Sequence, residues 1–242
     1  MDAYILIHGK HSGSEYGSDC SLDILDRSLR DKNFLVDFKT YPWGVKKVDN
    51  KFYWDTFESA VPMIDEAIQN LKDAGATRVF LIGHSMGGNA CLYYATQRSN
   101  FDGIVLLAPA HNLHLHLFAQ IHRWSVDQAK QMIDIGQGNE LSHFADYDST
   151  GSITVLNVPA TNYYSMLNPV GSANMQSNAK RIQSPLNVLA ISGTRDFTQK
   201  EFGESVYRYI TKTSKSKHLT IDGDHSSVCS EIDIIVNWSN SL

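Results

Sequence analysis

One short motif limits what this chain can fold into more than any other feature. Gly83-His84-Ser85-Met86-Gly87 follows an apolar run at 78–82 that is typical of a buried strand, and precedes a segment at 88–95 that is typical of a helix. Between a strand and a helix, Gly-x-Ser-x-Gly forms a strained turn in which a Cβ beside the serine would crowd the crossing backbone. Such a nucleophile elbow presents its serine hydroxyl at the strand end. The motif therefore predicts Ser85 as a nucleophile, against the alternative of an ordinary turn serine.

The rest of the chain alternates short apolar runs with segments whose apolar residues recur at helical spacing. The runs typical of strands lie at 4–7, 34–40, 78–82, 103–107, 187–191 and 218–221. Repeated strand–helix alternation favours a mostly parallel sheet that is covered on both faces. The sequence therefore predicts an α/β fold with about six strands.

Two polar side chains are expected at the carboxyl ends of later strands, where open α/β sheets carry their chemistry. Asp196 comes shortly after the run at 187–191, and His225 comes shortly after the run at 218–221. A serine hydroxyl needs a base to accept its proton, and an imidazole held by a carboxylate supplies one. The chain order Ser, Asp, His therefore predicts Ser85, Asp196 and His225 as the catalytic residues.

Other interpretations remain for the carboxylate that orients His225. Asp196 could cap the helix that follows it, which is a common role for an aspartate after a strand. Asp222 and Asp224 are close to His225 in the sequence and could orient it instead. Neighbouring residues rarely aim their side chains at each other, so these two are more typical of a tight turn.

Together these residues resemble the serine hydrolases of the α/β-hydrolase superfamily, in particular carboxylesterases, from Tyr4 to Trp238. His8-Gly9 at the end of the first strand also resembles that family. The resemblance implies two main-chain N–H groups that stabilise the oxyanion, one from Met86 and one from Lys10. Lys10-His11-Ser12-Gly13 stands where some lipases and esterases have a glycine-rich stretch. The resemblance further implies a trimmed, six-stranded version of the family sheet.

The segment 110–184 breaks the strand–helix rhythm, and the resemblance implies a small helical cap there, inserted in a single domain of residues 1–242. Three residues are candidates for the substrate pocket. His11 follows the first strand, His111 follows the fourth, and Tyr164 lies inside the insertion.

The insertion also contains a group of histidines, His111, His114, His116 and His122. Their spacing could bring two imidazoles to one helical face, as a zinc site requires. No nearby Cys, Asp or Glu completes a ligand set, so a polar face near the mouth of the site is favoured. No metal is predicted.

The composition of the chain limits which classes of partner it can bind. The formal net charge of −5 leaves no basic surface for nucleic acid. No apolar run reaches membrane-spanning length. The chain enters a strand at its N-terminus, without room for a signal peptide, so a cytoplasmic protein is expected. Composition carries no information on the oligomeric state.

The expected activity is hydrolysis of a small-molecule carboxylic ester through an acyl-enzyme intermediate, without a cofactor. The aromatic content of the insertion favours small to medium acyl chains. Thioester, lactone and C–C bond hydrolysis use the same residues and stay open. A non-catalytic ligand receptor of the same fold is the alternative from another class.

Overall fold

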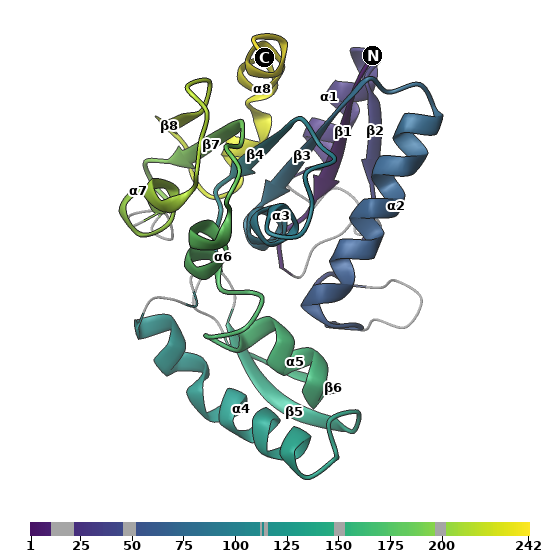
Figure 1. Cartoon of the computed structure of the whole chain (residues 1–242). Coiled ribbons are helices and arrows are strands. Elements are labelled where there is room, and N and C mark those ends of the chain that lie inside the picture. Colours follow the sequence, from purple (N-terminus) through teal and green to yellow (C-terminus); the bar gives the residue numbers. More distant parts are fainter. Residues whose placement is uncertain (11–21, 46–51, 112, 114–115, 148–152, 197–201) are drawn as a thin grey trace.

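A parallel sheet runs through the middle of the computed structural model, which describes residues 1–10, 22–45, 52–111, 113, 116–147, 153–196 and 202–242 (Figure 1). Its order is β2-β1-β3-β4-β7-β8, and every neighbouring pair is parallel. The strands are β1 (Asp2–Ile7), β2 (Leu35–Phe38), β3 (Arg78–His84), β4 (Gly103–Leu107), β7 (Val188–Gly193) and β8 (Lys217–Ile221). The six-stranded α/β fold predicted from the sequence is confirmed.

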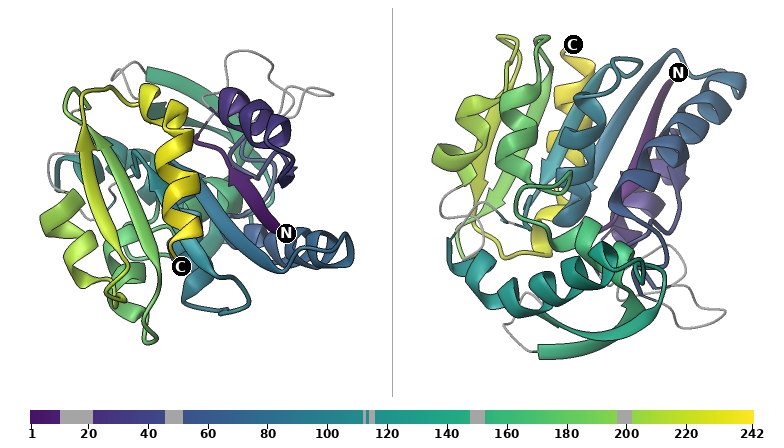
Figure 2. Two further views of the ribbon diagram at one scale, coloured as in Figure 1. Left: turned by 90° about the horizontal axis from the view of Figure 1, so that it is seen from above. Right: turned by 60° about the horizontal axis from the view of Figure 1, so that its bottom comes forward.

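Helices cover both faces of this sheet (Figure 2). Along β1, Tyr4 and Leu6 pack in one apolar cluster, and Ile5 and Ile7 pack in the other, because successive strand residues point to opposite faces. The first cluster includes residues of α1 (Asp23–Asp31), η5 (Ser227–Ser230) and α8 (Ile232–Asn240). The second includes residues of η2 (Phe57–Ser59), α2 (Ala60–Asp73), α3 (Met86–Ala95), α6 (Met175–Arg181) and α7 (Phe202–Ser205), with Tyr207 and Tyr209 of η4 (Tyr207–Tyr209) packed against it.

The segment 110–184 places most of its structure beyond the carboxyl ends of the strands, at the bottom of Figure 1. Its elements there are α4 (His116–Asp134), β5 (Leu141–Tyr147), β6 (Ile153–Pro159) and α5 (Ala160–Leu167). The expected helical cap is therefore corrected in one respect, because β5 and β6 pair as an antiparallel hairpin. The physical reason is a two-residue alternation, in which Leu156 and Val158 are buried and Val155 is exposed. No helix in the described ranges is both long and apolar enough to cross a membrane.

The sheet order reverses at β1. This strand has β2 on one side and β3 on the other, so the connections after β1 and after β3 leave in opposite directions. In open α/β sheets, ligands bind in the crevice at the carboxyl ends of such a pair of strands. Gly9 follows β1 and Ser85 follows β3, and the register pairs Ile7 with Gly83. The elbow serine is thus placed at the reversal point.

Candidate active site

Ser85 lies in a strained turn between β3 and α3. Its backbone has φ 53° and ψ −119°, a conformation that residues with a Cβ rarely adopt. The Ser85 amide donates to the carbonyl of Leu107 at 2.9 Å. The Ser85 carbonyl accepts from the amides of Gly88 at 3.0 Å and Ala110 at 3.2 Å. These bonds to β4 and α3 hold the turn in the strained conformation.

The two glycines of the motif are required by close backbone contacts. A Cβ on Gly83 would lie 2.4 Å from the carbonyl of Gly87, and a Cβ on Gly87 would lie 2.0 Å from the carbonyl oxygen of Ile7. Real Cβ atoms do not approach that closely, so side chains are excluded at both positions. The second contact joins the elbow to the end of β1. The motif therefore brings the turn at Ser85 against β1, the strand that precedes Lys10.

Asp196 and His225 meet after β7 and β8. His225 Nδ1 lies 2.7 Å from Asp196 Oδ2, and since a carboxylate accepts, the ring nitrogen donates. The Asp196 side chain is 1% exposed and that of His225 is 20% exposed. No hydrogen bond joins the Ser85 hydroxyl to this ring in the described part of the chain.

The loops that carry these two residues are joined along their main chains. Thr194 donates to the carbonyl of Ile221 and Arg195 donates to that of Gly223, each at 2.9 Å. A Cβ on Gly193 would lie 2.4 Å from the Gly223 carbonyl oxygen, so a glycine permits this approach. The pairing of two strand ends, which are distant in sequence, thus brings the acid to the imidazole.

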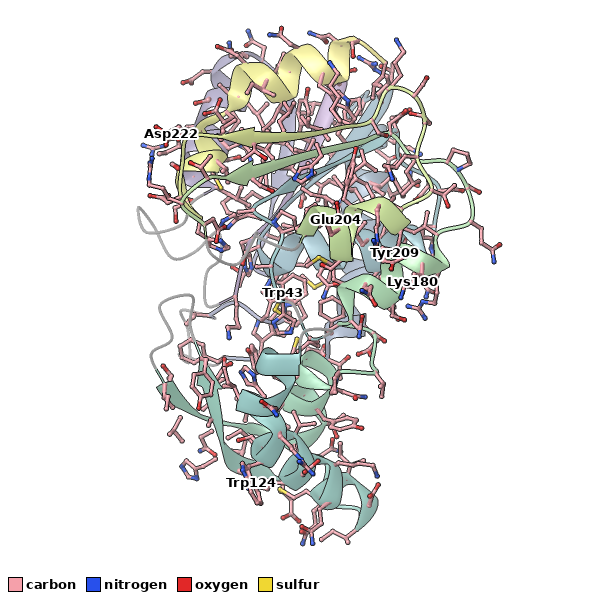
Figure 3. All side chains as sticks on the ribbon, turned by 90° about the vertical axis from the view of Figure 1, so that its left-hand side faces the viewer. Trp43, Trp124, Lys180, Glu204, Tyr209 and Asp222 are labelled. Atoms are coloured by element: carbon pink, nitrogen blue, oxygen red, sulfur yellow. The ribbon has the colours of Figure 1, made fainter. Side chains whose placement is uncertain are left out.

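The other two candidate acids have different contacts. Asp222 is exposed, lies at the outer end of the loop after β8 (Figure 3), and forms an ion pair with Arg195. Asp224 accepts from the amides of Ser226 at 3.0 Å and Ser227 at 2.8 Å, and these bonds lower its pKa. Asp224 thus shapes a tight turn, and neither acid is bonded to the His225 ring among the described contacts.

His84 supports the same loop. Its Nε2–H donates to the main-chain carbonyl of His225 at 2.8 Å, and the two rings are 4.9 Å apart. Burial, with a smaller contribution from His225, lowers the pKa of His84 to about 3. The ring is therefore neutral near pH 7 and acts as a fixed hydrogen-bond donor.

Met86 and Lys10 are the candidate oxyanion donors. Met86 begins α3, and the first amides of a helix have no carbonyl partner within it. Lys10 follows Gly9, where a Cβ would lie 3.0 Å from Ser85 Cβ, so the end of β1 reaches the nucleophile turn. Both main chains therefore lie next to Ser85.

The loop after β1 is held by His8, whose ring is fully buried. Its Nδ1–H donates to the carbonyl of Gly9 at 2.6 Å and its Nε2 accepts from the amide of Tyr41 at 2.8 Å. Burial lowers the pKa of His8 to about 4, which keeps this neutral tautomer. Trp43, which lies where the sheet meets the insertion (Figure 3), donates its Nε1–H to the His8 carbonyl.

With this geometry in place, comparison with known proteins identifies the family. A model of the serine aminopeptidase S33 family matches residues 46–231. The chain belongs to this hydrolase family. It is a serine hydrolase of the α/β-hydrolase superfamily, as the sequence resemblance predicted. Among curated proteins, none matches the sequence significantly.

Several solved structures share the fold over 99% of this S33-family chain. They include a monoacylglycerol lipase from Paleococcus ferrophilus, at 20% identity, TM-score 0.67 and 94% of its own chain. The α/β hydrolase GrgF from Penicillium sp. sh18 aligns at 14% identity, TM-score 0.70 and 88%. A thermostable carboxyl esterase from Bacillus coagulans, in complex with glycerol, aligns at 13% identity, TM-score 0.68 and 89%. At these identities the likeness shows the fold.

The three pocket candidates of this S33-family hydrolase have different positions. His11 lies outside the described residues. His111 is buried beyond β4 with φ 74°, and its Nε2–H donates to the carbonyl of Met166 at 2.6 Å. Tyr164 lines an open hollow of about 500 Å³ between η2, α4 and α5, to which Ser85 contributes no atoms. His111 thus bonds to α5 and follows Ala110, whose amide donates to the Ser85 carbonyl, whereas Tyr164 lines a separate hollow.

The histidine group of this S33-family hydrolase is only partly described, because His114 is outside the described ranges and nothing is described of the His116 side chain. His111 bonds to α5, and His122 Nε2 lies 3.5 Å from Asp146 Oδ1. Among the described residues, no group of three His, Cys, Asp or Glu side chains could hold a metal ion.

One set of contacts in this S33-family hydrolase has no counterpart in the sequence prediction. The side chain of Lys10 is bonded to Asp146 of β5, which is also bonded to Tyr53. No local pattern signals such contacts, because Lys10 and Asp146 are 136 positions apart.

Proposed function

We propose that this S33-family hydrolase cleaves carboxylic esters of small to medium acyl chain through an acyl-enzyme at Ser85. One observation carries the proposal: a serine in a strained elbow lies at the reversal point of the sheet, beside a loop on which the His225 imidazole is hydrogen-bonded to buried Asp196. That arrangement supplies a nucleophile, a base and a group that holds the base.

In this mechanism His225 acts first as a base. Its Nδ1–H donates to Asp196, so the Nε2 lone pair is available for the Ser85 proton. Ser85 Oγ attacks the ester carbonyl, and the tetrahedral oxyanion accepts hydrogen bonds from the Met86 and Lys10 amides. The imidazolium then gives its proton to the departing alkoxide as the C–O bond breaks. Asp196 stabilises the imidazolium while the charge is present.

The second half of the reaction releases the carboxylic acid product. A water molecule gives a proton to His225 and attacks the acyl-enzyme carbonyl, and the same amides stabilise the second oxyanion. The proton returns to Ser85 Oγ as its bond to carbon breaks, which regenerates the enzyme. The proposed chain length rests on the aromatic content of the insertion. Inside it, the rings of Phe144 and Tyr163 stack 4.5 Å apart.

Structural likeness to a monoacylglycerol lipase and a carboxyl esterase favours esters over other carbonyl substrates. The family description names an aminopeptidase, so amide cleavage is the competing outcome. An ester is the easier substrate for this site, because an alkoxide is a much weaker base than an amide anion and therefore a better leaving group.

The test is turnover of p-nitrophenyl esters from acetate to decanoate, with alanine p-nitroanilide as the amide probe. We expect the highest kcat/KM on short and medium esters and a loss of at least about 10⁴-fold in kcat for Ser85→Ala. A fluorophosphonate should label wild type at Ser85. Absence of p-nitrophenol from every ester would overturn the proposal, and ligand binding without turnover would then support a receptor.

Three matched variants test which aspartate holds the His225 imidazole. Asp196→Asn should lower kcat by about 10⁴-fold, because the amide cannot hold the required tautomer. Asp222→Asn and Asp224→Asn make the same change at neighbouring carboxylates that are not bonded to the imidazole. Activity retained in Asp196→Asn and lost in one of the other two would reassign the acid.

A further inference from the structure

A buried ion pair links the loop after β1 to the insertion. Lys10 Nζ donates to Asp146 Oδ1 at 2.8 Å and also to the carbonyl of Tyr147. The side chain of Asp146 is 0% exposed and that of Lys10 is 13% exposed. Lys10 belongs to the loop beside the nucleophile, whereas Asp146 belongs to β5 of the insertion. The pair therefore joins parts of the chain that lie on either side of the site.

Asp146 is the centre of this contact. Its Oδ1 also accepts from the amide of Tyr147 at 2.9 Å, and its Oδ2 accepts from the Tyr53 hydroxyl at 2.8 Å. Burial and the nearby carboxylate raise the pKa of Tyr53 well above its ordinary value, so the phenol stays a donor. His122 Nε2 lies 3.5 Å from Oδ1. A buried carboxylate with this many donors has a defined position and holds the Lys10 ammonium in one place.

We propose that Asp146 is a positioning residue that holds the Lys10 main-chain amide in the oxyanion site. Catalysis then depends on the contact between Lys10 and the insertion. The proposal rests on the proposed function, in which that amide stabilises the oxyanion. The physical step is short. The Lys10 side chain is fixed at its far end by Asp146 and the Tyr147 carbonyl, and its main chain follows Gly9, which abuts Ser85.

This coupling has a specific kinetic signature. An oxyanion donor acts on charge that develops in the transition state, so its displacement lowers kcat and leaves ester binding nearly unchanged. A merely structural ion pair would lower the melting temperature and leave the kcat of the folded enzyme intact. The ratio of the effects on kcat and KM therefore separates the two roles.

The chain offers a matched control at the start of β1, the strand that precedes Lys10. Asp2 at the start of β1 forms a two-bond ion pair with Arg78, at 2.6 and 2.8 Å, at the opposite end from the site. Asp146→Asn and Asp2→Asn make the same chemical change in two ion pairs, one beyond the carboxyl end of β1 and one at its start. We expect both to lower the melting temperature, and only Asp146→Asn to lower kcat, by about 10- to 100-fold with KM within about threefold.

The remaining variants complete the test. Lys10→Met should lower kcat similarly, and the double variant Lys10→Met/Asp146→Asn should be no worse than the poorer single variant, because both changes break one link. If a single variant does not fold, Lys10→Met/Asp146→Leu removes both charges and still lacks the link. A wild-type kcat in any folded variant without the link would overturn the proposal.

The rate of labelling by the fluorophosphonate tests the positioning role of Asp146 separately from the proposed esterase function. Its rate also depends on the oxyanion donors, so slow labelling of Asp146→Asn beside fast labelling of wild type and Asp2→Asn supports the positioning role even if no ester is turned over. Equal labelling rates in all three would reject the positioning role alone. Wild type that neither labels nor turns over esters would reject the proposed function and, with it, this inference.

Discussion

His84 and His225 are joined by a hydrogen bond that runs from the nucleophile motif to the loop of the proposed base. The Nε2–H of His84 donates to the His225 carbonyl at 2.8 Å, and the rings are 4.9 Å apart. The residue before Ser85 thus holds the main chain from which the His225 imidazole projects. Because burial keeps His84 neutral, with a pKa of about 3, this bond persists through the range in which hydrolysis would be measured.

We expect His84→Phe to lower kcat/KM about tenfold or more with a smaller change in KM. The ring packing on His225 is retained, but the carbonyl loses its donor and the loop can shift. Steady-state kinetics and the melting temperature measure the effect. His218→Phe is the control, because His218 is also partly buried and bonded, to Ser192 Oγ at 3.0 Å. An equal loss in both variants would contradict a specific role for His84.

The strain at Ser85 predicts an unusual order of stability. Alanine is normally better tolerated than glycine, but φ 53° with ψ −119° penalises any Cβ. We expect Ser85→Gly to have a free energy of unfolding about 1 kcal/mol above that of Ser85→Ala. Both variants lack the hydroxyl, so the comparison isolates the backbone, and urea unfolding measures it. If Ser85→Ala were the more stable of the two, the elbow would not be strained.

Gly87 is expected to tolerate no side chain. The Cβ of Gly87→Ala would lie 2.0 Å from the Ile7 carbonyl oxygen, so β1 or α3 would have to move. We expect a loss above about 4 kcal/mol in unfolding free energy, or failure to fold. Gly75→Ala is the control, with φ 96° and no atom within 4 Å of the new Cβ, and should cost about 1–2 kcal/mol. Soluble yield and urea unfolding distinguish the two, and similar losses would contradict the contact.

Three of the buried histidines in the described ranges predict that the protein is less stable at acid pH. Burial lowers the pKa to about 4 for His8 and to about 3 for His84 and His111. Between about pH 6.5, where unfolded histidine titrates, and about pH 4, the unfolded state binds more protons. The unfolding free energy therefore falls as pH falls in this window, by about 1 kcal/mol per pH unit for each histidine.

Urea unfolding between pH 7 and pH 5 measures this slope. His111→Asn should reduce it, since asparagine removes the imidazole and tolerates the φ of 74°. The exposed His143 provides the control, and His143→Asn should leave the slope unchanged. An unchanged slope in His111→Asn would contradict a buried neutral imidazole there.

Local patterns predicted most of the core fold. The apolar runs at 4–7 and 103–107 lie within β1 and β4, because a strand buried on both faces needs a continuous apolar run. The segment 218–221 lies within β8, which is at the edge of the sheet. The prediction failed inside 110–184, where β5 and β6 form a hairpin. The alternation of burial in these strands is hard to recognise from the sequence, because exposed positions such as Leu141 and Ile153 also carry apolar residues.

For the candidate site, as for the fold, local sequence patterns predicted some features and missed others. The sequence by itself determined the elbow, because Gly83 and Gly87 are demanded by contacts within a few residues or with the neighbouring strand. It also placed Asp196 and His225 after the fifth and sixth strands that the alternation pattern predicted along the chain. Only the tertiary structure decided which acid bonds to His225, and that Lys10 is bonded to Asp146. The physical reason is range: backbone sterics and periodicity act locally, whereas ion pairs and hydrogen bonds between distant segments exist only once the sheet and the insertion have packed.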